Sequence, residues 1–442
     1  MSELDARTVN EGLVRFLDES PSMFHSCDTI CRRLDEAGFV RLREGDAWEV
    51  VPGSRCYVVR NGSSVAAFRV GSQLDSYHFQ LVAAHGDSPT YKVKSVPELE
   101  GPGSYLRLDV EPYGGMLDHT WLDRPLGLAG RVLVRDGAAV RSRLVRIDRD
   151  VCLIPSLAIH MAHESGLAPR LDRACDLMPL FSAGELGRGD FDAMVAEAAD
   201  VDPADVLARD LFLVAHEAPR VWGQADEFLS AGRLDDLQSA YAGLTAFLAS
   251  DNPHDVSAFV CFDNEEVGSN TKQGAMSTFL ADCLARLNSA LGRTEDDLRR
   301  AVAGSMLVSC DNAHALHPAH AEKHDPANRC LLNGGIVVKE AANQHYCTDA
   351  FSRAVLCAVL DDAGVPHQTF ANRSDMAGGG TLGNLSNTQV SMHGVDVGMP
   401  QLAMHSVYET TGAQDTALGA RALLAFYDAD LRIDGAEAAT LA

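Results

Sequence analysis

Short apolar runs that end in a histidine or a carboxylate recur along this chain and constrain its fold more than any other feature. Residues 79–84 are mostly apolar and stop at His85, residues 256–262 stop at Asp263, and a third run leads to Asp311. A buried strand that delivers a polar side chain at its carboxyl end is how open α/β sheets build their sites. The pattern therefore predicts a sheet with a functional site along one edge.

The segments around these runs alternate between helical and extended patterns, which indicates a parallel or mixed sheet covered by helices. Asn61-Gly62 is a strong hairpin signal, with strands expected over 55–60 and 64–70. Helices are expected over 8–17, 22–37, 237–248, 277–303, 350–361 and 415–427, and further strands over 335–339 and 367–370. We therefore expect an α/β fold with a mixed central sheet flanked by helices.

The middle of the chain has a different texture. Extended segments follow one another without helices between them, at 105–110, 129–135 and 139–147, before an acidic helix-compatible stretch at 190–210. A chain of 442 residues also exceeds what one hydrophobic core ordinarily supports. We expect a discontinuous α/β domain, 1–90 and 228–442, interrupted by a β-rich domain at 91–227.

The charge balance excludes several classes of partner. The chain has 37 Lys and Arg against 62 Asp and Glu, for a net charge of −25, which repels phosphate backbones and anionic lipid. We therefore expect no nucleic-acid partner and no membrane partner. No run approaches the roughly 20 apolar residues of a membrane-spanning helix, and the charged N-terminus is unlike a signal peptide. The 11 cysteines form no Cys-x-x-Cys pair, which favours free thiols and the cytoplasm.

Several short segments carry the side chains of a hydrolytic metal site, and each alone has a plainer interpretation. His85 and Asp87 fit a metal-bound imidazole whose ring is held by a carboxylate, but they also fit a polar loop. Asp235 suits a bridging ligand, although carboxylates before a helix also act as caps. Asp311 again follows an apolar run, and His405 lies in an apolar stretch where a buried core histidine is the commoner outcome.

Glu265 and Glu266 favour a metal site over the plainer interpretations. Three carboxylates within residues 263–266 end a buried strand, where they repel one another unless cations compensate. Glu265 and Glu266 would then have different roles, one as a general base and the other as a ligand. Oxygen and imidazole ligands without thiolate suit Zn²⁺, Mn²⁺ or Co²⁺. Two such ions would share a bridging hydroxide, and Glu265 would pass the proton of that water to the leaving amine.

The order of these residues resembles that of the co-catalytic dinuclear zinc aminopeptidases, and the motifs around them resemble the aspartyl aminopeptidase family in particular. The motifs are His-Gly-Asp-Ser-Pro at 85–89, Arg-Leu-Asp-Asp at 233–236, Asp-Asn-Glu-Glu-Val-Gly-Ser at 263–269, Asp-x-Ala-His-Ala-x-His-Pro at 311–318 and Leu-Ala-Met-His-Ser at 402–406. The resemblance implies two Zn²⁺ per subunit, one on His85, Asp235 and Asp311. The other would lie on Asp235, Glu266 and His405, with Glu265 as the base.

The resemblance also implies an assembly with shared active sites. Pro-Ser-Leu-Ala-Ile-His at 155–160 looks like the family segment whose histidine reaches a neighbouring subunit. His160 is therefore expected to stabilise the developing oxyanion in trans, although an exposed loop histidine is the alternative. The family forms tetrahedral dodecamers through its insertion. A cytoplasmic homododecamer that acts on peptides is the resulting expectation.

Departures from the family motifs bear on substrate preference. The segment Lys-x-Asn-x-x-Gln-Arg-Tyr keeps its lysine as Lys339 but has His345 in place of its arginine. The segment Arg-x-Asp-x-x-Cys-Gly-Ser-Thr keeps Arg373 but lacks the Cys and Ser side chains, and Tyr408 stands where an arginine is usual. Lys339 and Arg373 still suit an acidic substrate side chain. We expect these four positions to bind substrate, with activity on N-terminal Asp or Glu and relaxed selectivity.

Two other functions stay open from the sequence. A related metal-dependent deacylase or dipeptidase would use the same metals with a different clamp, and a requirement for a free amine distinguishes it. A catalytically silent shell or scaffold protein would keep the metals without turnover. The presence of Glu265 and of all five expected ligands favours the enzyme.

Overall fold

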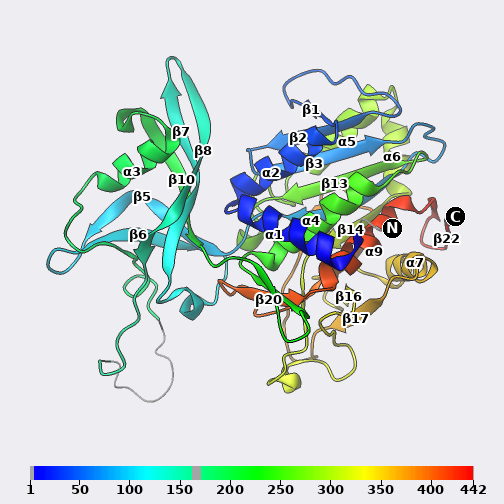
Figure 1. Cartoon of the computed structure of the whole chain (residues 1–442). Coiled ribbons are helices and arrows are strands. Elements are labelled where there is room, and N and C mark those ends of the chain that lie inside the picture. Colours follow the sequence, from blue (N-terminus) through cyan, green and yellow to red (C-terminus); the bar gives the residue numbers. More distant parts are fainter. Residues whose placement is uncertain (1–3, 162–170, 442) are drawn as a thin grey trace.

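The computed structural model describes residues 4–161 and 171–441 and consists of an α/β lobe and a β-barrel lobe (Figure 1). A nine-stranded mixed sheet runs through the α/β lobe in the order β1-β2-β3-β13-β4-β14-β18-β16-β17. Its strands are β1 (Val40–Leu42), β2 (Arg55–Arg60), β3 (Ser64–Val70), β13 (Val256–Phe262), β4 (Phe79–His85), β14 (Met306–Cys310), β18 (His393–Gly398), β16 (Ile336–Glu340) and β17 (His367–Ala371). The strands β13, β4, β14 and β18 are parallel, so their carboxyl ends share one edge. The expected fold class is confirmed.

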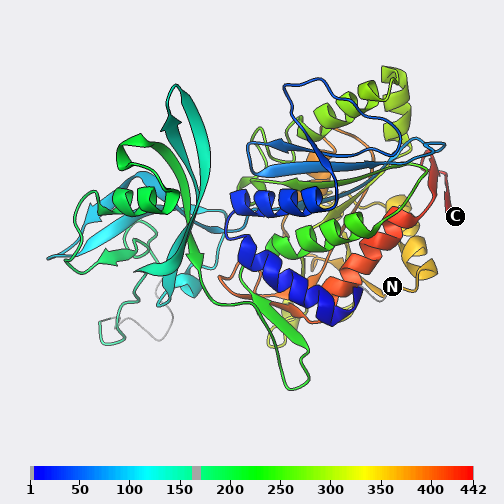
Figure 2. The same cartoon turned by 45° about the horizontal axis from the view of Figure 1, so that its top comes forward.

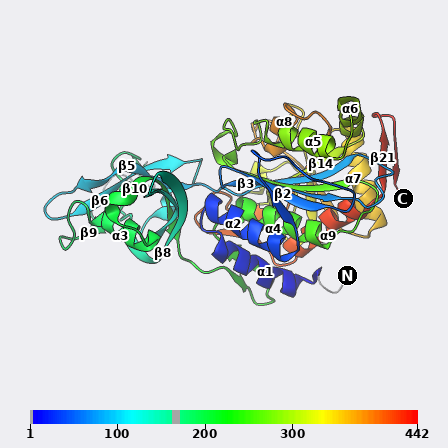
Figure 3. The same ribbon diagram turned by 90° about the horizontal axis from the view of Figure 1, so that it is seen from above.

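Alternate side chains of the central strands face two helical layers. Val82 and Ala84 of β4 pack in one core, whereas Leu81 and Ala83 pack in the other. The first layer contains α1 (Ala6–Glu19), α2 (Met23–Glu36), α4 (Leu234–Ala249), α7 (Ala350–Asp362) and α9 (Asp415–Asp428), and the second contains α5 (Phe279–Ala290), α6 (Glu295–Ala303) and α8 (Leu382–Ser386). Figure 2 shows α1, α4 and α9 side by side, and Figure 3 shows the two layers on opposite faces of the sheet. Burial on both faces explains the continuous apolar runs of the sequence.

Most of the residues between β4 and α4 form the second lobe, a closed barrel with the strand order β10-β5-β6-β9-β8-β7. Its strands are β5 (Thr90–Glu100), β6 (Leu106–Tyr113), β7 (Pro125–Asp136), β8 (Ala139–Leu153), β9 (Leu180–Ser182) and β10 (Val206–Ala215). The helix α3 (Asp190–Ala199) packs Phe191 and Val195 into the barrel core. A separate β-rich domain is thus present, while its boundaries at 91 and 227 stay a prediction.

Smaller sheets complete the α/β lobe. A five-stranded sheet has the order β11-β12-β20-β19-β15. Its strands are β11 (Arg220–Trp222), β12 (Phe228–Ala231), β20 (Glu409–Gly412), β19 (Pro400–Leu402) and β15 (Ala313–His314), and a terminal hairpin pairs β21 (Leu431–Asp434) with β22 (Ala438–Leu441). Within the described residues, no helix combines the length and the apolarity that crossing a membrane requires.

The helix expected over 190–210 is wrong in its second half. The helix α3 ends at Ala199, and Asp200 adopts the left-handed conformation with φ 54° and ψ 54°. Pro203 follows and cannot donate a backbone hydrogen bond, and β10 begins at Val206. The strand β10 pairs antiparallel with β7 along its length. This pairing between distant segments makes residues 206–215 a strand, and no local pattern in the sequence predicts it.

Candidate metal centre

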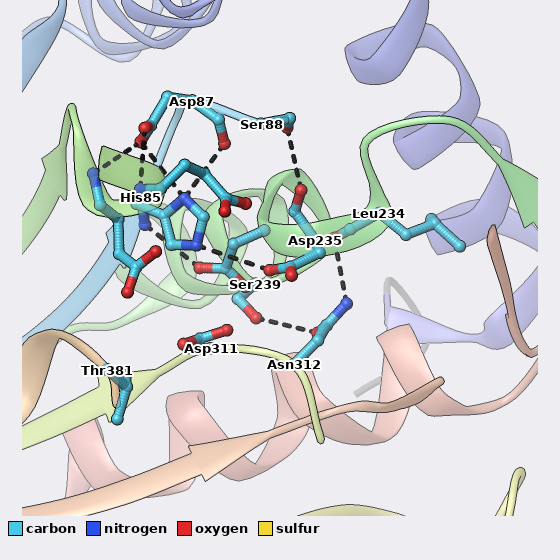
Figure 4. A network of polar contacts seen from close by, with 12 residues as sticks. His85, Asp87, Ser88, Leu234, Asp235, Ser239, Asp311, Asn312 and Thr381 are labelled. Carbon is cyan, nitrogen blue, oxygen red and sulfur yellow. Dashed lines mark hydrogen bonds and ion pairs between the residues drawn. The ribbon is translucent and has the colours of Figure 1, made fainter. Parts of the chain in front are cut away.

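The polar side chains that end the apolar strands converge at one edge of the central sheet. His85 is the last residue of β4, Asp311 follows β14, and Glu265 and Glu266 lie in the 3₁₀ turn Glu265–Val267 after β13. These strands are parallel, so their carboxyl ends meet at the same edge. Figure 4 shows the imidazole of His85 between Asp87 and Asp235, with Asp311 below it. The topology therefore gathers residues that lie far apart in the sequence.

Asp235 lies between the two histidines of this cluster. It precedes the regular part of α4, because Asp235 and Asp236 have non-helical backbone angles; the peptide bond between them is cis. Asp235 Oδ1 lies 3.5 Å from His85 Nε2, and Asp235 Oδ2 lies 3.1 Å from His405 Nε2. Glu266 Oε2 lies 3.5 Å from the same His405 nitrogen. The two oxygens of Asp235 thus face different imidazoles, as the oxygens of a bridging carboxylate would.

The ligand atoms of the cluster form three overlapping groups within the described residues. In each group all the atoms lie within 4.8 Å of one another: His85 with Asp235, Asp236 and Asp311; His85 with Glu265 and Glu266; and Asp235 with Glu266 and His405. The first group contains one of the ligand sets expected from the sequence, and the third is the other. Each group has the composition of a site for a divalent cation.

Carboxylates outnumber cations here, and several of their oxygens lack partners. Among the described residues, Asp235 Oδ1, Asp236 Oδ1 and Glu266 Oε1 are buried and accept no hydrogen bond. Burial, together with the charge of Asp235, raises the pKa of Glu266 well above its usual range. Burial likewise raises the pKa of Glu265 to about 7. Divalent cations would satisfy these oxygens and offset the repulsion, so the oxygen and imidazole donors fit zinc.

Asp87 contacts three residues of the cluster, His85, Glu265 and Glu266. Its backbone oxygen and its Oδ1 lie 3.1 Å and 3.3 Å from His85 Nδ1. Its carboxylate also accepts hydrogen bonds from the backbone N–H groups of Glu265 and Glu266, each at 3.2 Å. A carboxylate or carbonyl on the second ring nitrogen directs the other nitrogen of the histidine toward the cluster. Asp87 therefore ties the end of β4 to the turn that follows β13.

Arg373 lines a pocket of about 360 Å³. The lining includes His314 and Ala403, which neighbour Asp311 and His405 in the sequence. Further basic and potentially basic side chains of the lining are His317, Lys323 and His324. Burial lowers the pKa of His314 to about 4 and also lowers the pKa of His324, so these two imidazoles add no positive charge at neutral pH. Among the described residues, the charged side chains of the lining are Lys323 and Arg373, and Arg373 is paired with Asp375.

The other residues expected to bind substrate lie in different surroundings. Lys339 is buried, and its Nζ donates a hydrogen bond to the backbone oxygen of Asp311 at 2.8 Å. His345 is exposed. Tyr408 donates from its hydroxyl to the backbone oxygen of Ala218 at 2.9 Å. None of the three lines the pocket beside Arg373 among the described residues. Their roles toward substrate stay predictions.

His160 is exposed on the loop that follows β8 and belongs to none of the three ligand groups among the described residues. Three large apolar side chains around it are also exposed, with relative accessibilities of 61% for Leu157, 80% for Ile159 and 73% for Met161. The role of His160 in a neighbouring subunit stays a prediction.

Comparison with known proteins decides the family. The profile of the family described as "Aminopeptidase I zinc metalloprotease (M18)" matches residues 16–427. The chain belongs to the M18 family of zinc aminopeptidases. A "Probable M18 family aminopeptidase 2" of Clostridium novyi is 40% identical over 422 residues, which cover 94% of this chain and 98% of that protein.

Solved structures share the fold of this M18 aminopeptidase. A chain from a cryo-EM structure of the Ape4 and Nbr1 complex is 32% identical, with a TM-score of 0.92, covering 96% of this chain and 86% of that one. A chain of the mApe1 dodecamer of S. cerevisiae is 27% identical, with a TM-score of 0.84, covering 97% of each chain. The expected aminopeptidase family and the expected class of peptide hydrolase are therefore confirmed.

Sequence reasoning missed three residues at the centre of this M18 aminopeptidase. Asp236 joins the first ligand group, and its Oδ2 accepts the backbone N–H of His85 at 3.1 Å. Glu409 is buried and accepts the backbone N–H groups of Asp235 at 3.0 Å and of His405 at 2.7 Å. Burial raises the pKa of Glu409 to about 8. Their positions beside Asp235 and four residues after His405 were the available signals. The third residue, Tyr113, comes from the barrel, and its hydroxyl donates to Asp87 Oδ2 at 2.7 Å. No sequence signal pointed to it.

Proposed function

We propose that this M18 aminopeptidase binds two Zn²⁺ per subunit and removes N-terminal residues, preferentially but not strictly Asp and Glu, from peptides. In this proposal His85, Asp235 and Asp311 hold one ion, and Asp235, Glu266 and His405 hold the other. The observation that carries the proposal is that Asp235 belongs to two separate ligand groups, with one oxygen toward each histidine. Bound zinc supplies Lewis-acid polarisation of the scissile carbonyl and acidification of water, and Mn²⁺ or Co²⁺ would substitute.

Glu265 is the general base in this proposal. It lies outside both proposed ligand sets, although its carboxylate groups with His85 and Glu266. Its backbone N–H is held by Asp87, which limits the movement of the turn. Glu265 would take a proton from the attacking water and deliver it to the leaving amine. Asp87 would keep His85 in the ligating orientation.

The pocket lined by Arg373 supports a preference for acidic N-terminal side chains. Arg373 makes two parallel hydrogen bonds to Asp375, from Nε to Oδ1 at 2.8 Å and from Nη2 to Oδ2 at 2.9 Å. A substrate carboxylate would take the place of Asp375 on the same edge of the guanidinium. Lys323 adds a second positive charge to the same pocket. His345 and Tyr408 replace arginines of the resembled family, so fewer fixed cations face the substrate. The proposed selectivity is therefore relaxed.

We also propose a cytoplasmic, tetrahedral homododecamer in which the barrel lobe mediates assembly. The likeness to a chain of the mApe1 dodecamer supports this proposal. The exposed side chains Leu157, Ile159 and Met161 support it too, since a neighbouring subunit would cover them and bring His160 to a second active site.

Zinc analysis combined with a panel of N-terminal substrates tests the proposal. We expect two zinc ions per subunit and the highest kcat/KM on Asp- and Glu-linked substrates, with slower turnover of Leu- and Ala-linked ones. A clear preference for Leu contradicts the acidic preference. The N-acetylated Asp substrate is the control and should be inert, because turnover of it would indicate a deacylase. Light scattering gives the size of the assembly.

A further inference from the structure

The barrel lobe reaches the metal centre through the end of β6. Tyr113, the last residue of that strand, donates from its hydroxyl to Asp87 Oδ2 at 2.7 Å. The same hydroxyl oxygen accepts a hydrogen bond from Asn264 Nδ2, also at 2.7 Å. Its ring packs edge-on against Phe212 of β10, with the ring centroids 5.4 Å apart. A residue of the barrel is therefore bonded to the side chains that flank the turn bearing Glu265.

The segment that follows Tyr113 contacts the other histidine of the centre. The backbone oxygen of Gly115 accepts a hydrogen bond from His405 Nδ1, and the backbone N–H of Leu117 donates to the backbone oxygen of His405 at 3.0 Å. Because a carbonyl can only accept, Nδ1 is the donor of this hydrogen bond, and Nε2 is the ring nitrogen that faces Asp235. A Cβ at Gly114 would lie 3.1 Å from the Cβ of Glu266, so the segment runs closely against the centre.

We infer that Tyr113 is a positioning residue of the metal centre, so that the barrel lobe completes the active site as well as serving assembly. Asp87 Oδ2 accepts hydrogen bonds from Tyr113 and from the backbone of Glu266. Without the hydroxyl, the backbone N–H groups of Glu265 and Glu266 still hold the Asp87 carboxylate, but its orientation toward His85 is less restricted. The orientation of His85 and of the Glu265 turn would then loosen together. This inference rests on the proposed roles of His85 and Glu265.

The substitution Tyr113→Phe tests the inference because it keeps the ring and removes only the hydroxyl. Tyr91→Phe is the matched control. Tyr91 is a buried tyrosine of the same barrel that donates to Asp118 Oδ1 at 2.6 Å and packs edge-on against Trp121. We expect Tyr113→Phe to lower kcat by roughly 10-fold with KM changed by less than about 2-fold. We also expect zinc to pass to a chelator roughly 10-fold faster than from the wild type. The control should change neither quantity.

Two comparisons separate this inference from the proposed function. A Tyr113→Phe variant that matches Tyr91→Phe in kcat and in zinc release overturns the inference, including the case in which both lose the same thermal stability. Glu265→Gln should lower kcat by about 10²- to 10⁴-fold and release zinc at the wild-type rate. If that variant keeps the wild-type kcat, the proposed function fails, and the zinc-release comparison of the two tyrosine variants still decides the role of Tyr113.

Discussion

Asp210 of the barrel and the carboxylates of the metal centre are held in opposite ways. Asp210 contacts Lys92 Nζ at 2.8 Å and Arg131 Nε at 3.0 Å. At the edge of the central sheet, Asp235 and Glu266 each have a buried oxygen without a hydrogen-bond partner among the described residues. Paired surface carboxylates add a little stability, whereas buried unpaired ones cost stability. The net charge of −25 therefore includes paired carboxylates such as Asp210 and buried unpaired ones, and only the buried unpaired ones are arranged for metal.

Removal of the metal should have the largest effect, because it should destabilise the α/β lobe and leave the barrel unchanged. A chelator should abolish activity and destabilise the α/β lobe, because its buried carboxylates then repel one another. At zinc concentrations about 100 times the Kd, the loss is on the order of 3 kcal/mol. Hydrogen exchange should rise in β4 and β14 and stay unchanged in β7 and β8. Zinc should restore both properties, and a metal-free protein as stable as the zinc form would contradict the assignment.

Glu265→Gln should separate chemistry from metal binding. Loss of a general base lowers kcat by about 10²- to 10⁴-fold. Zinc content should stay at the wild-type value, and the metal-free variant should not be less stable than the metal-free wild type, since one buried charge has been removed. Activity assays, metal analysis and thermal unfolding measure the three quantities. Glu295→Gln on the surface of α6 is the control and should leave all of them unchanged.

The sequence predicts those parts of this site that depend on local patterns. The hairpin strands expected over 55–60 and 64–70 coincide with β2 and β3. The gathering of His85 and Asp311 follows from polar residues that end apolar strands, once the strands are parallel. The parallel arrangement itself follows from the alternation of strands with helices.

Other parts depend on tertiary contacts that no local pattern reports. The strand β18 lies inside the central sheet, but its short, glycine-containing sequence His-Gly-Val-Asp-Val-Gly has no strong strand signal. Glu409 acts through backbone N–H groups that only the folded chain brings to it. Tyr113 comes from a different lobe, so neither its distance in sequence nor its neighbours indicate a role at the centre.

Arg373→Ala should weaken the preference for acidic substrates, because it removes one of the positive charges of the pocket. A charge-assisted hydrogen bond contributes about 1.5–3 kcal/mol, and 1.4 kcal/mol corresponds to a tenfold change. The ratio of kcat/KM for Asp-linked over Leu-linked substrates should fall by roughly 10-fold, mainly through the Asp substrate. Arg432→Ala in the hairpin β21–β22 is the control. An unchanged ratio in Arg373→Ala would remove Arg373 from the substrate site.

Asp210→Asn should have the smallest effect and tests the barrel side of the comparison. Burial alone would raise the pKa of Asp210, but hydrogen bonds from Lys92 and Arg131 lower it below its usual value. The folded state therefore binds fewer protons than the unfolded state, and the resulting stability is present at neutral pH and lost as the pH falls through the folded pKa. The variant should be less stable than the wild type by about 0.5–1 kcal/mol at pH 7, with unchanged kcat. Urea unfolding of both metal-free proteins should show a smaller difference at pH 4 and also at high salt, because protonation or screening then weakens the pairs that the wild type retains. If the difference in unfolding free energy between the wild type and Asp210→Asn grew as the pH fell, the prediction would be wrong. Asp210 would then be destabilised by its surroundings, as the carboxylates of the metal centre are, rather than stabilised by its ion pairs.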